Sequence, residues 1–445
     1  MYNTRDNIVA LATIPGKSAL NVIRCSGGSC VLLYKALFKE KKVSAPGFVH
    51  LKQAYSKELV IDQCMVTFFR GPKSYTGENM LEISTHGGTV IAQKIIQLIE
   101  SNKFRPAHPG EFTYRAFVNG KLDLAQAESV QTIIDSRNSL DSLYSIKNVQ
   151  GHFSNQVSSM KSKIKKILSY MEHEMDFSED EIDFETHTNY MKNIKKVASS
   201  IASLLEKSYL TKQNKSSVVI ALAGKTNVGK SSLFNKIIGY DRSIVTRMEG
   251  TTRDTVEAEI IINNINVRIV DTAGIRKTKE IIEKKGISKT FEAIKGSNLV
   301  LFVDNLSPRK CIKSFPKIFK DKKILYIKSK SDLARHTKER GSFSVSSKEG
   351  KGVATLLKNI TKEIDSFMHA FLDSNIFLIN NRQKSILVDT LGFLKESLAS
   401  YKKTGDAAIA SSFLRSAHNK LSEVQGYEDK DEIINNIFQG FCVGK

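Results

Sequence analysis

The segment 224–231 (GKTNVGKS) constrains the fold of this chain more than any other. An apolar run, residues 218–222, precedes it, and residues 232–238 follow it with helical character. In a strand–loop–helix of this kind, glycines let backbone N–H groups converge on phosphate oxygens, and the helix N-terminus adds positive potential. The segment therefore predicts a nucleoside triphosphate site in which Lys230 reaches the β- and γ-phosphates and Ser231 ligates Mg²⁺. The neighbouring residues expected to complete the phosphate site are Asn227, Val228, Gly229 and Ser232.

The distribution of Gly, Pro and apolar residues divides the 445-residue chain into four segments. Residues 1–120 mix short β-like runs with turns and one helical stretch, which indicates an α+β domain. Residues 121–215 and 373–445 have apolar residues at helical spacing, whereas 216–372 alternate strands and helices. We therefore predict a multidomain α+β and α/β fold. A P-loop domain of the Ras-like type is inserted into one discontinuous helical domain, behind a separate N-terminal domain.

The composition is that of an ordinary globular protein, with 41% hydrophobic and 25% charged residues. No apolar run approaches the roughly 18 residues of a membrane span, so no membrane association is expected. Five cysteines without metal-ligand spacing suit a reducing compartment, and a cytoplasmic location is predicted.

The net charge of +21 results from 67 Lys and Arg against 46 Asp and Glu residues. Such an excess attracts polyanions through counterion release, which favours a nucleic-acid partner. A chain that is simply rich in Lys, Asn and Ile would carry the same charge, so the charge alone does not establish that partner.

Two further segments have the order and composition of nucleotide switches. Residues 250–254 (GTTRD) resemble switch I, with Thr252 expected to ligate Mg²⁺. A strand at 267–270 leads into 271–274 (DTAG). There Asp271 is expected to support Mg²⁺ and the Gly274 amide to meet the γ-phosphate, with Thr272 and Ala273 between them.

The base site is predicted at residues 329–332 (SKSD), after a strand at 324–327. The Asp332 carboxylate can accept two hydrogen bonds from the ring N–H and exocyclic amine of guanine, which adenine does not offer. Most GTPases have Asn where this chain has Ser329. We expect the shorter side chain to lose a contact to the base and one to the phosphate loop, and so to weaken binding while keeping guanine preference. The other residues expected at this site are Lys330, Ser346, Ser347 and Lys348.

The chain lacks the usual catalytic glutamine. Ras-like GTPases carry Gln directly after the DxxG motif, but here that position is Ile275. An apolar side chain cannot orient an attacking water, so another group has to do so.

The last five residues, 441–445 (FCVGK), place a thiol and a lysine where no fold obviously needs them. Together with the nucleotide motifs, this ending resembles the tRNA-modification GTPases called MnmE or TrmE, although Ile is commoner than Val443 in that motif. Three N-terminal strings resemble the folate-binding domain of the same family, and they lie within residues 15–24, 74–82 and 109–128. The resemblance thus spans essentially the whole chain.

For the nucleotide domain, the resemblance implies a water-orienting carboxylate and a potassium ion. Glu283 matches the family's glutamate. From the sequence alone, Glu283 would equally be interpreted as a solvent-exposed charge on a helix. The potassium ion would take the place of an arginine finger when two such domains meet face to face. The residues that match its site are Asn227, Thr246, Met248 and Thr251, and a turn-forming role for Asn227 is the alternative.

For the N-terminal domain, the resemblance implies that Arg24, Glu82 and Lys121 hold a tetrahydrofolate derivative of the 5-formyl or methylene type. Cys442 and Lys445 would approach that folate. Cys442 would then be a nucleophile or redox residue, or else a small apolar residue that docks a C-terminal helix through Phe441.

The function implied is addition of an aminomethyl-type group at C5 of the wobble uridine of certain tRNAs, driven by GTP hydrolysis. It implies a homodimer that works with an FAD-dependent partner, MnmG or GidA, in a heterotetramer. The alternatives are a regulatory GTPase that binds ribosomal RNA and a degenerate scaffold. The first leaves the N-terminal 120 residues and the last five without a role, and the second is suggested only by Ser329.

Overall fold

The computed structural model of the chain describes most of its residues in two compact units. The first unit comprises residues 1–134, 145–206 and 381–445, and the second comprises 135–144 and 207–380. The described residues are 2–136, 139–175, 184–210, 218–240, 256–262, 265–272, 291–314, 319, 322–333, 339–373, 377–426 and 431–444.

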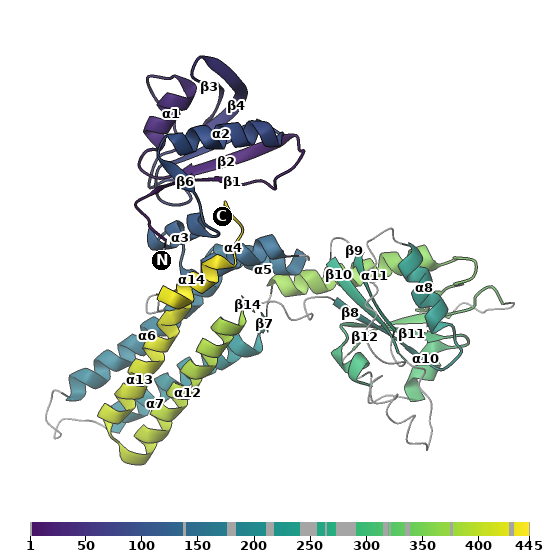
Figure 1. Ribbon diagram of the computed structural model, residues 1–445. Helices are drawn as coiled ribbons and strands as arrows, with labels where there is room; N and C mark the ends of the chain where they lie inside the picture. Colours follow the sequence, from purple (N-terminus) through teal and green to yellow (C-terminus); the bar gives the residue numbers. More distant parts are fainter. Residues whose placement is uncertain are drawn as a thin grey trace. The chain divides into compact units, whose positions relative to one another are not determined.

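The first unit begins with a six-stranded sheet of order β3-β4-β5-β2-β1-β6 (Figure 1). All neighbours are antiparallel except β1 and β6, which are parallel. The elements are β1 (Asn7–Leu11), β2 (Leu20–Ser26), α1 (Cys30–Phe38), β3 (Val49–Ser56), β4 (Leu59–Phe69), β5 (Met80–His86), α2 (Thr89–Ser101), β6 (Phe104–Pro106) and α3 (Glu111–Val118).

Alternation along the strands separates a packed face from an open face of this sheet. Ile23, Val66 and Ile83 point to the side covered by α1 and α2, and they share one core with Leu33 and Ile95 of those helices. Side chains of a strand alternate between faces, so Arg24 and its cross-strand partner Glu82 lie on the opposite face. This alternation places the predicted folate residues away from the core.

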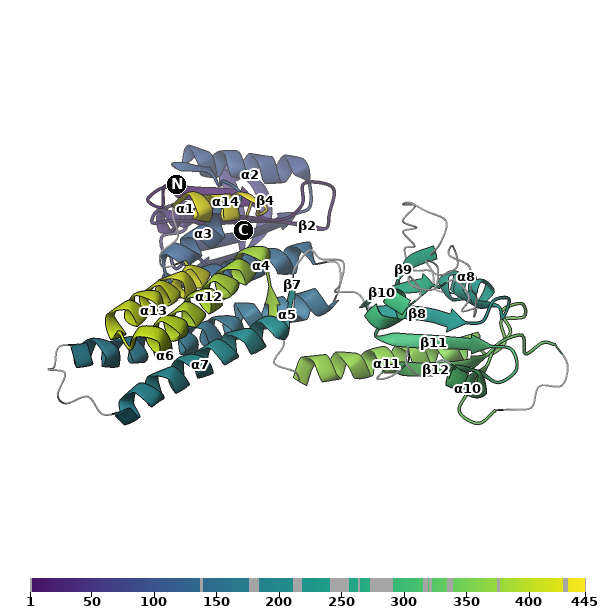
Figure 2. The ribbon, with the colours of Figure 1, turned by 90° about the horizontal axis from the view of Figure 1, so that it is seen from below.

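The helical part of the first unit contains both helical segments of the sequence. Helices α6, α7, α12 and α13 lie side by side in both ribbon views (Figures 1 and 2). The Arg382 guanidinium of α12 pairs with Glu128 of α4 at 2.8 Å, so the ion pair joins residues 254 apart in sequence. The elements are α4 (Leu124–Asp135), α5 (Ser139–Val149), α6 (His152–Met175), α7 (Phe184–Glu206), α12 (Asn381–Thr404), α13 (Ala407–Ser422), η3 (Glu423–Gln425) and α14 (Asp431–Gln439). The part of α5 before residue 145 belongs to the second unit.

The second unit contains a six-stranded sheet of order β13-β12-β11-β8-β10-β9. Its strands are parallel except β9, which runs antiparallel to β10 at the edge. A separate two-stranded sheet pairs β7 with β14. The elements are β7 (Ser208–Leu210), β8 (Val218–Gly224), α8 (Lys230–Tyr240), β9 (Val256–Ile262), β10 (Ile265–Asp271), β11 (Leu299–Asp304), α10 (Pro308–Cys311), η2 (Ile312–Ser314), β12 (Lys323–Lys328), β13 (Phe343–Ser344), α11 (Val353–Asp373) and β14 (Phe377–Ile379).

Strand β8 is central and buried along its whole length, as expected for a parallel strand covered on both faces. Leu222 packs with Leu233 of α8 and Leu356 of α11 on one face, whereas Ala221 and Phe302 pack on the other. Parallel strands β8, β10, β11 and β12 therefore end at one edge, where nucleotide sites of such sheets form.

The predicted fold class is confirmed: the chain combines an α+β sheet domain, helices from two sequence segments and a P-loop α/β sheet. The domain boundaries 1–120, 121–215 with 373–445, and 216–372 stay a prediction. None of the described helices is both long and apolar enough to cross a membrane. All five cysteines are free thiols.

Candidate functional site

The phosphate loop lies between β8 and α8 in a conformation that its glycines make possible. Gly224 has φ +149°, and a Cβ atom there would lie 2.1 Å from the Val303 carbonyl oxygen. Gly229 has φ +98°, and the exposed Asn227 has φ +61°. Asn tolerates the left-handed region better than most residues, so the turn at Asn227 is explained locally.

Lys230 and Ser231 stand at the start of α8, where the phosphates are expected. The Lys230 ammonium donates to the carbonyl oxygens of Lys225 at 2.8 Å and Gly224 at 3.3 Å. Burial lowers the pKa of Lys230, and the charge of Asp271 partly opposes that shift. A desolvated cation held on neutral carbonyls can exchange these contacts for phosphate oxygens, which are stronger partners.

Asp271 at the end of β10 supplies the carboxylate that a magnesium site requires. Its Oδ2 accepts from the Ser231 hydroxyl at 2.7 Å, whereas its buried Oδ1 has no hydrogen-bond partner. Burial raises the pKa of Asp271, and the Ser231 hydrogen bond and the Lys230 charge oppose the shift. An unpaired buried carboxylate oxygen beside a serine hydroxyl fits a Mg²⁺ ion that completes its shell with phosphates and water. The next residue, Thr272, donates its hydroxyl to the Leu222 carbonyl oxygen at 2.6 Å and so joins β10 to β8.

The predicted base residues lie together at the ends of β12 and β13. Asp332 Oδ1 accepts from the buried Ser346 hydroxyl at 2.7 Å. The Lys330 ammonium reaches the Asn227 carbonyl oxygen at 2.9 Å, so the base and phosphate segments are directly joined. Ser347 is half-buried and Lys348 is exposed in the loop that follows Ser346.

One expectation about Ser329 is wrong. The loss of a contact to the phosphate loop was expected, but the Ser329 hydroxyl donates to the Val228 carbonyl oxygen at 2.5 Å. The side chain is only 4% exposed and reaches the loop because β12 ends close to it. The hydroxyl therefore keeps the tie between the base motif and the phosphate loop.

Several predicted site residues lie outside the described residues. They are Thr246, Met248, Thr251, Thr252, Ala273, Gly274, Glu283 and Lys445.

A second group of predicted residues gathers on the open face of the N-terminal sheet. Arg24 pairs with Glu82 at 2.7 Å, and its side chain is 17% exposed. Its guanidinium lies 5.7 Å from the ring centre of Tyr75 and 5.8 Å from that of Phe112, within the range of cation–π attraction. Tyr75 and Phe112 belong to strings singled out in the sequence, yet neither was predicted as a site residue. The sequence feature that could have identified them is an aromatic residue next to a polar turn.

The C-terminal tail reaches this same face. The Arg24 guanidinium donates to the Gly444 carbonyl oxygen at 3.0 Å, and the Gly110 amide donates to the Cys442 carbonyl at 3.4 Å. Phe441 is buried against Tyr114 and Phe438, while Cys442 is exposed. Gly444 has φ +94°, and a Cβ there would lie 2.9 Å from the Ala12 Cα, so the close approach favours glycine. The structure thus brings Arg24, Glu82 and the tail together.

Lys121 follows α3 and contacts the loop between β4 and β5. Its ammonium donates to the Pro72 carbonyl oxygen at 3.0 Å, and the nearby Asn119 amide donates to the Thr76 carbonyl at 2.7 Å. These two bonds attach the end of α3 to the loop that carries Tyr75.

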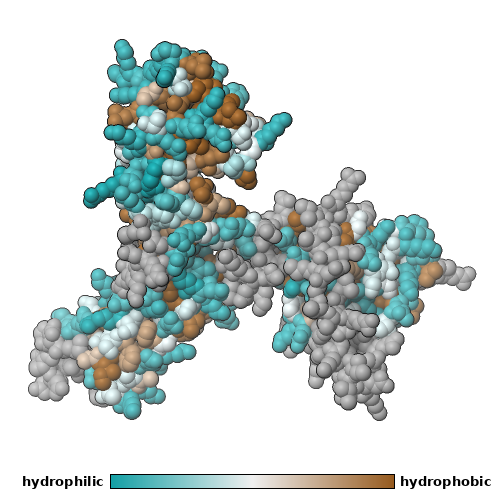
Figure 3. All heavy atoms as spheres, in the orientation of Figure 1, coloured by the Kyte–Doolittle hydropathy of each residue, from teal (hydrophilic) through white to brown (hydrophobic). Residues whose placement is uncertain are grey.

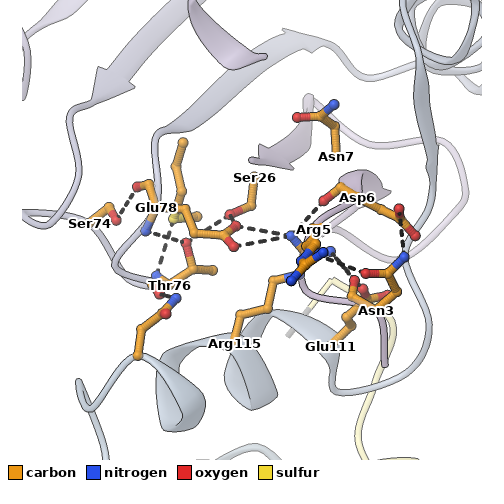
Figure 4. Close-up of polar contacts among 12 residues, drawn as sticks. Asn3, Arg5, Asp6, Asn7, Ser26, Ser74, Thr76, Glu78, Glu111 and Arg115 are labelled. Atoms are coloured by element: carbon orange, nitrogen blue, oxygen red, sulfur yellow. Dashed lines mark hydrogen bonds and ion pairs between the residues drawn. The ribbon is translucent and has the colours of Figure 1, made fainter. Parts of the chain in front are cut away.

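A buried ionic network supports the loop and helix that frame Arg24 (Figure 4). Arg115 of α3 is fully buried and pairs with Glu111 at 2.9 Å and with Glu78 at 3.0 Å. Glu78 also accepts from the Ser26 hydroxyl at 2.6 Å, two residues beyond Arg24 on β2. Arg115 donates further to the Asp6 carbonyl oxygen at 2.7 Å. The network therefore ties four segments of the N-terminal domain to one guanidinium.

Glu111→Gln is expected to lower the free energy of unfolding by about 3 kcal/mol near neutral pH, because it removes the fully buried carboxylate that pairs with both Arg115 and Arg105 and leaves Arg115 with Glu78 as its remaining ionic partner among the described residues. Burial alone would raise the pKa of Glu111. Hydrogen bonds from Arg105, the His108 amide and Arg115 outweigh burial, so this pKa is lowered in the folded chain. The stabilisation is therefore present above the unfolded pKa of about 4.3 and is lost as the pH falls toward the lower folded value.

Urea unfolding of the full chain at pH 7.5 and pH 4 measures both effects. The matched control is Glu58→Gln, which breaks an exposed pair with Lys39 and should change stability little. An equal, small effect of both substitutions at pH 7.5 would show that the network does not stabilise the domain.

Known proteins match this chain over nearly its full length. Residues 7–121 match the model of the GTP-binding protein TrmE N-terminus, and residues 124–442 match that of the MnmE helical domain. A tRNA modification GTPase MnmE from Flavobacterium psychrophilum is 32% identical over 99% of both chains. Those of Thermotoga maritima and Aquifex aeolicus are 34% identical over 99% of this chain and 100% of theirs. The chain belongs to the MnmE family.

Membership in the MnmE family confirms the resemblance inferred from the phosphate loop, the N-terminal strings and the terminal FCVGK. The MnmE helical-domain match, residues 124–442, spans both helical segments and the P-loop sheet between them. Among solved structures, the G domain of the Thermotoga maritima FeoB iron transporter covers 33% of this chain and 98% of its own, with 24% identity and a TM-score of 0.28.

Proposed function

This chain is a tRNA-modification GTPase of the MnmE family, and we propose that it selects guanine at the base site and holds the nucleotide phosphates at the loop described above. The observation that carries the proposal is the base site, where Asp332 is oriented by Ser346 and joined through Lys330 to the phosphate loop. A carboxylate in this position selects guanine by its two N–H donors. Lys230 would hold the β- and γ-phosphates, and Ser231 with Asp271 would hold Mg²⁺, which neutralises charge that develops on the phosphates.

The specific modification that we propose is the addition of an aminomethyl-type group at C5 of the wobble uridine of certain tRNAs. The chain would carry it out with an FAD-dependent MnmG partner in a heterotetramer. The net charge of +21 supports a polyanionic partner such as tRNA. Such an activity belongs in the cytoplasm. With the boundaries predicted from the sequence, the N-terminal domain 1–120 would serve folate binding and dimerisation, and the inserted domain 216–372 would hydrolyse GTP.

A tetrahydrofolate derivative would bind at the open sheet face beside Arg24. Glu82 could accept from the ring N–H groups of a pterin, the Arg24 guanidinium could bind an anionic or carbonyl group, and Lys121 could meet the anionic tail. When bound, the folate would supply the one-carbon unit. Cys442 lies exposed on the tail that Arg24 holds, and with Lys445 it would face the folate.

Arg24→Gln is expected to weaken binding of 5-formyltetrahydrofolate at least about tenfold, because a charged hydrogen-bond donor contributes roughly 1.5–3 kcal/mol. Isothermal titration on the full chain measures the affinity. The matched control is Arg415→Gln, which breaks an exposed pair with Glu172 on the helical part. Equal folate affinity of wild type and both variants would remove Arg24 from the site.

A homodimer would bury the open face of the N-terminal sheet. Hydrophobic side chains reach the surface in this part of the molecule (Figure 3). Leu51 and Met65 are directly paired across β3 and β4 and are 62% and 52% exposed. Exposed apolar side chains grouped on one face are typical of an interface, so a second copy of the chain is the occupant we propose.

In the second unit, a potassium ion would complete the nucleotide site when two such domains meet. Asn227 is exposed at the top of the phosphate loop, where its side chain is accessible to a facing domain. Thr246, Met248 and Thr251 would supply further oxygens, Thr252 would reach Mg²⁺, and Glu283 would orient the attacking water in place of the missing glutamine.

The function is tested by complementation of a bacterial strain that lacks its own MnmE, with mass spectrometry of wobble uridines in its tRNA. Restoration of the modified uridine by this chain, and loss of restoration in Lys230→Met, is the expected result. Unchanged tRNA together with ribosomal RNA recovered on the purified chain would instead support the regulatory GTPase.

A further inference from the structure

The outer side of helices α6 and α7 is strongly basic. Residues 152–171 contain four lysines and residues 189–205 contain three, and neither stretch contains an Asp or Glu residue. The two helices pack against each other (Figure 2), with Ile164 and Ile194 fully buried. Six of the lysines are exposed, and they define the α6–α7 face: Lys163, Lys165, Lys166, Lys192, Lys195 and Lys196.

Helical spacing gathers these lysines with polar and aromatic side chains. Lys163, Lys166 and Tyr170 stand at positions i, i+3 and i+7 of α6, so they form one row that is roughly 10 Å long. Lys192 and Ser199 have the same i, i+7 spacing on α7, with two further lysines between them. The result is two neighbouring rows of ammonium groups on one side of the helical part.

The charge of the α6–α7 face is not compensated locally. None of its six ammonium groups pairs with a carboxylate of the described residues. On the other two long helices the charges are mixed. Asp389 and Glu396 interrupt the lysines of α12, and Lys420 of α13 pairs with Glu423 at 2.8 Å and lies 3.8 Å from Asp389. Unpaired charges of one sign create a positive surface potential that attracts polyanions.

The other side chains of this face fit RNA better than a membrane or a protein. Exposed hydroxyls of Ser159, Ser162 and Ser199 can donate to phosphate or ribose oxygens, and Tyr170, which is 65% exposed, can stack on a base. A membrane-bound helix would need an exposed apolar side, but the apolar sides of α6 and α7 are buried in the bundle. Protein interfaces are depleted of lysine.

We propose that the α6–α7 face binds the sugar–phosphate backbone of the tRNA substrate. The inference rests on the proposed function and adds the surface that holds its RNA. Contacts from lysines to phosphates position a nucleic acid without reading its sequence, so one face can hold several tRNAs that differ in sequence.

The test measures binding of an unmodified tRNA transcript with uridine at the wobble position. Fluorescence anisotropy on the full chain gives the affinity between about 50 and 200 mM NaCl, without nucleotide. The triple variant Lys163→Gln, Lys166→Gln and Lys196→Gln should bind roughly 10- to 100-fold more weakly than wild type. Its slope of log affinity against log salt should be smaller by about 2 to 3, because each lost phosphate contact releases fewer counterions.

The matched control removes the same charge from the same bundle. It is the triple variant Lys384→Gln, Lys395→Gln and Lys402→Gln, at exposed positions of α12. It should keep the affinity within about threefold of wild type and should keep the salt slope. Glutamine is a good helix former, so both triple variants should fold and should hydrolyse GTP without RNA as wild type does.

Tyr170→Ala separates stacking from charge. It should weaken tRNA binding at least about fivefold with the salt slope unchanged, whereas Tyr170→Phe should keep the affinity of wild type. An unchanged affinity of Tyr170→Ala would remove Tyr170 from the RNA surface.

Three outcomes would overturn the proposal in different ways. If the α6–α7 variant and the α12 control bind tRNA equally well with equal salt slopes, the assigned face is wrong, while the proposed function stands. If tRNA affinity is unchanged but the α6–α7 variant no longer restores modified uridine in cells, the face binds a protein instead. A wild-type chain that neither binds the transcript nor restores the modified uridine would overturn the proposed function and this inference with it.

Discussion

A Lys230→Met variant is expected to lose roughly 100- to 1,000-fold in kcat/KM for GTP, comparable to removal of one preorganised donor from a charge-stabilising site. The buried ammonium donates to the carbonyl oxygens of Gly224 and Lys225, and phosphate oxygens would be stronger acceptors for it. Methionine keeps an unbranched side chain but removes the charge. Phosphate release under saturating and limiting GTP measures the loss.

The matched control for this variant is Lys358→Met, on the exposed side of α11 in the same unit. It removes the same charge from the chain, so it separates the effect of losing Lys230 from the effect of a lower net charge. A Lys230→Met enzyme that hydrolyses GTP as fast as Lys358→Met would contradict the assigned phosphate site.

An Asp332→Asn variant is expected to change the base specificity from guanine to xanthine. Asn keeps an oxygen that accepts from the ring N–H and from Ser346, but its amide N–H groups meet the exocyclic amine of guanine as donor against donor. Xanthine has a carbonyl there instead. We expect kcat/KM for GTP to fall by roughly 100-fold or more and turnover of XTP to rise by a similar factor, as in sites built around complementary hydrogen bonds.

The control is Asp365→Asn, on α11 of the same unit, which should leave the ratio of GTP to XTP turnover at its wild-type value. Loss of activity with both nucleotides in Asp332→Asn, at unchanged thermal stability, would indicate that Asp332 does more than select the base. Unchanged GTP preference would remove it from the base site.

Local patterns in the sequence predicted the nucleotide site because its parts are short and their order is fixed by the strands of the sheet. Val218–Gly224 forms β8, the residues from Lys230 form α8, and Asp271 ends β10, as the motif requires. Ser329 shows the limit of such reasoning. Its departure from Asn was visible, but its bond to Val228 depends on how closely β12 approaches the loop.

The site on the open face of the N-terminal sheet could not be predicted from local sequence patterns, because it is formed by contacts between residues far apart in the chain. Arg24 meets Gly444 across 420 residues of sequence, and Arg115 of α3 has partners in two other segments, at Asp6 and Glu78. Without the family resemblance, Arg24 and Glu82 would each have been interpreted as a surface charge. Tyr75 and Phe112 acquire a role only when the fold sets their rings beside the guanidinium.

The most direct test of the account is GTP hydrolysis by the purified full chain in potassium against sodium buffer, with ATP as the control nucleotide. The account predicts strong stimulation by potassium with GTP and no turnover of ATP, because Asp332 would select guanine and a potassium ion at Asn227 would stabilise charge on the phosphates. Equal, slow rates in the two salts would contradict the potassium site, and equal turnover of ATP and GTP would contradict the guanine site itself.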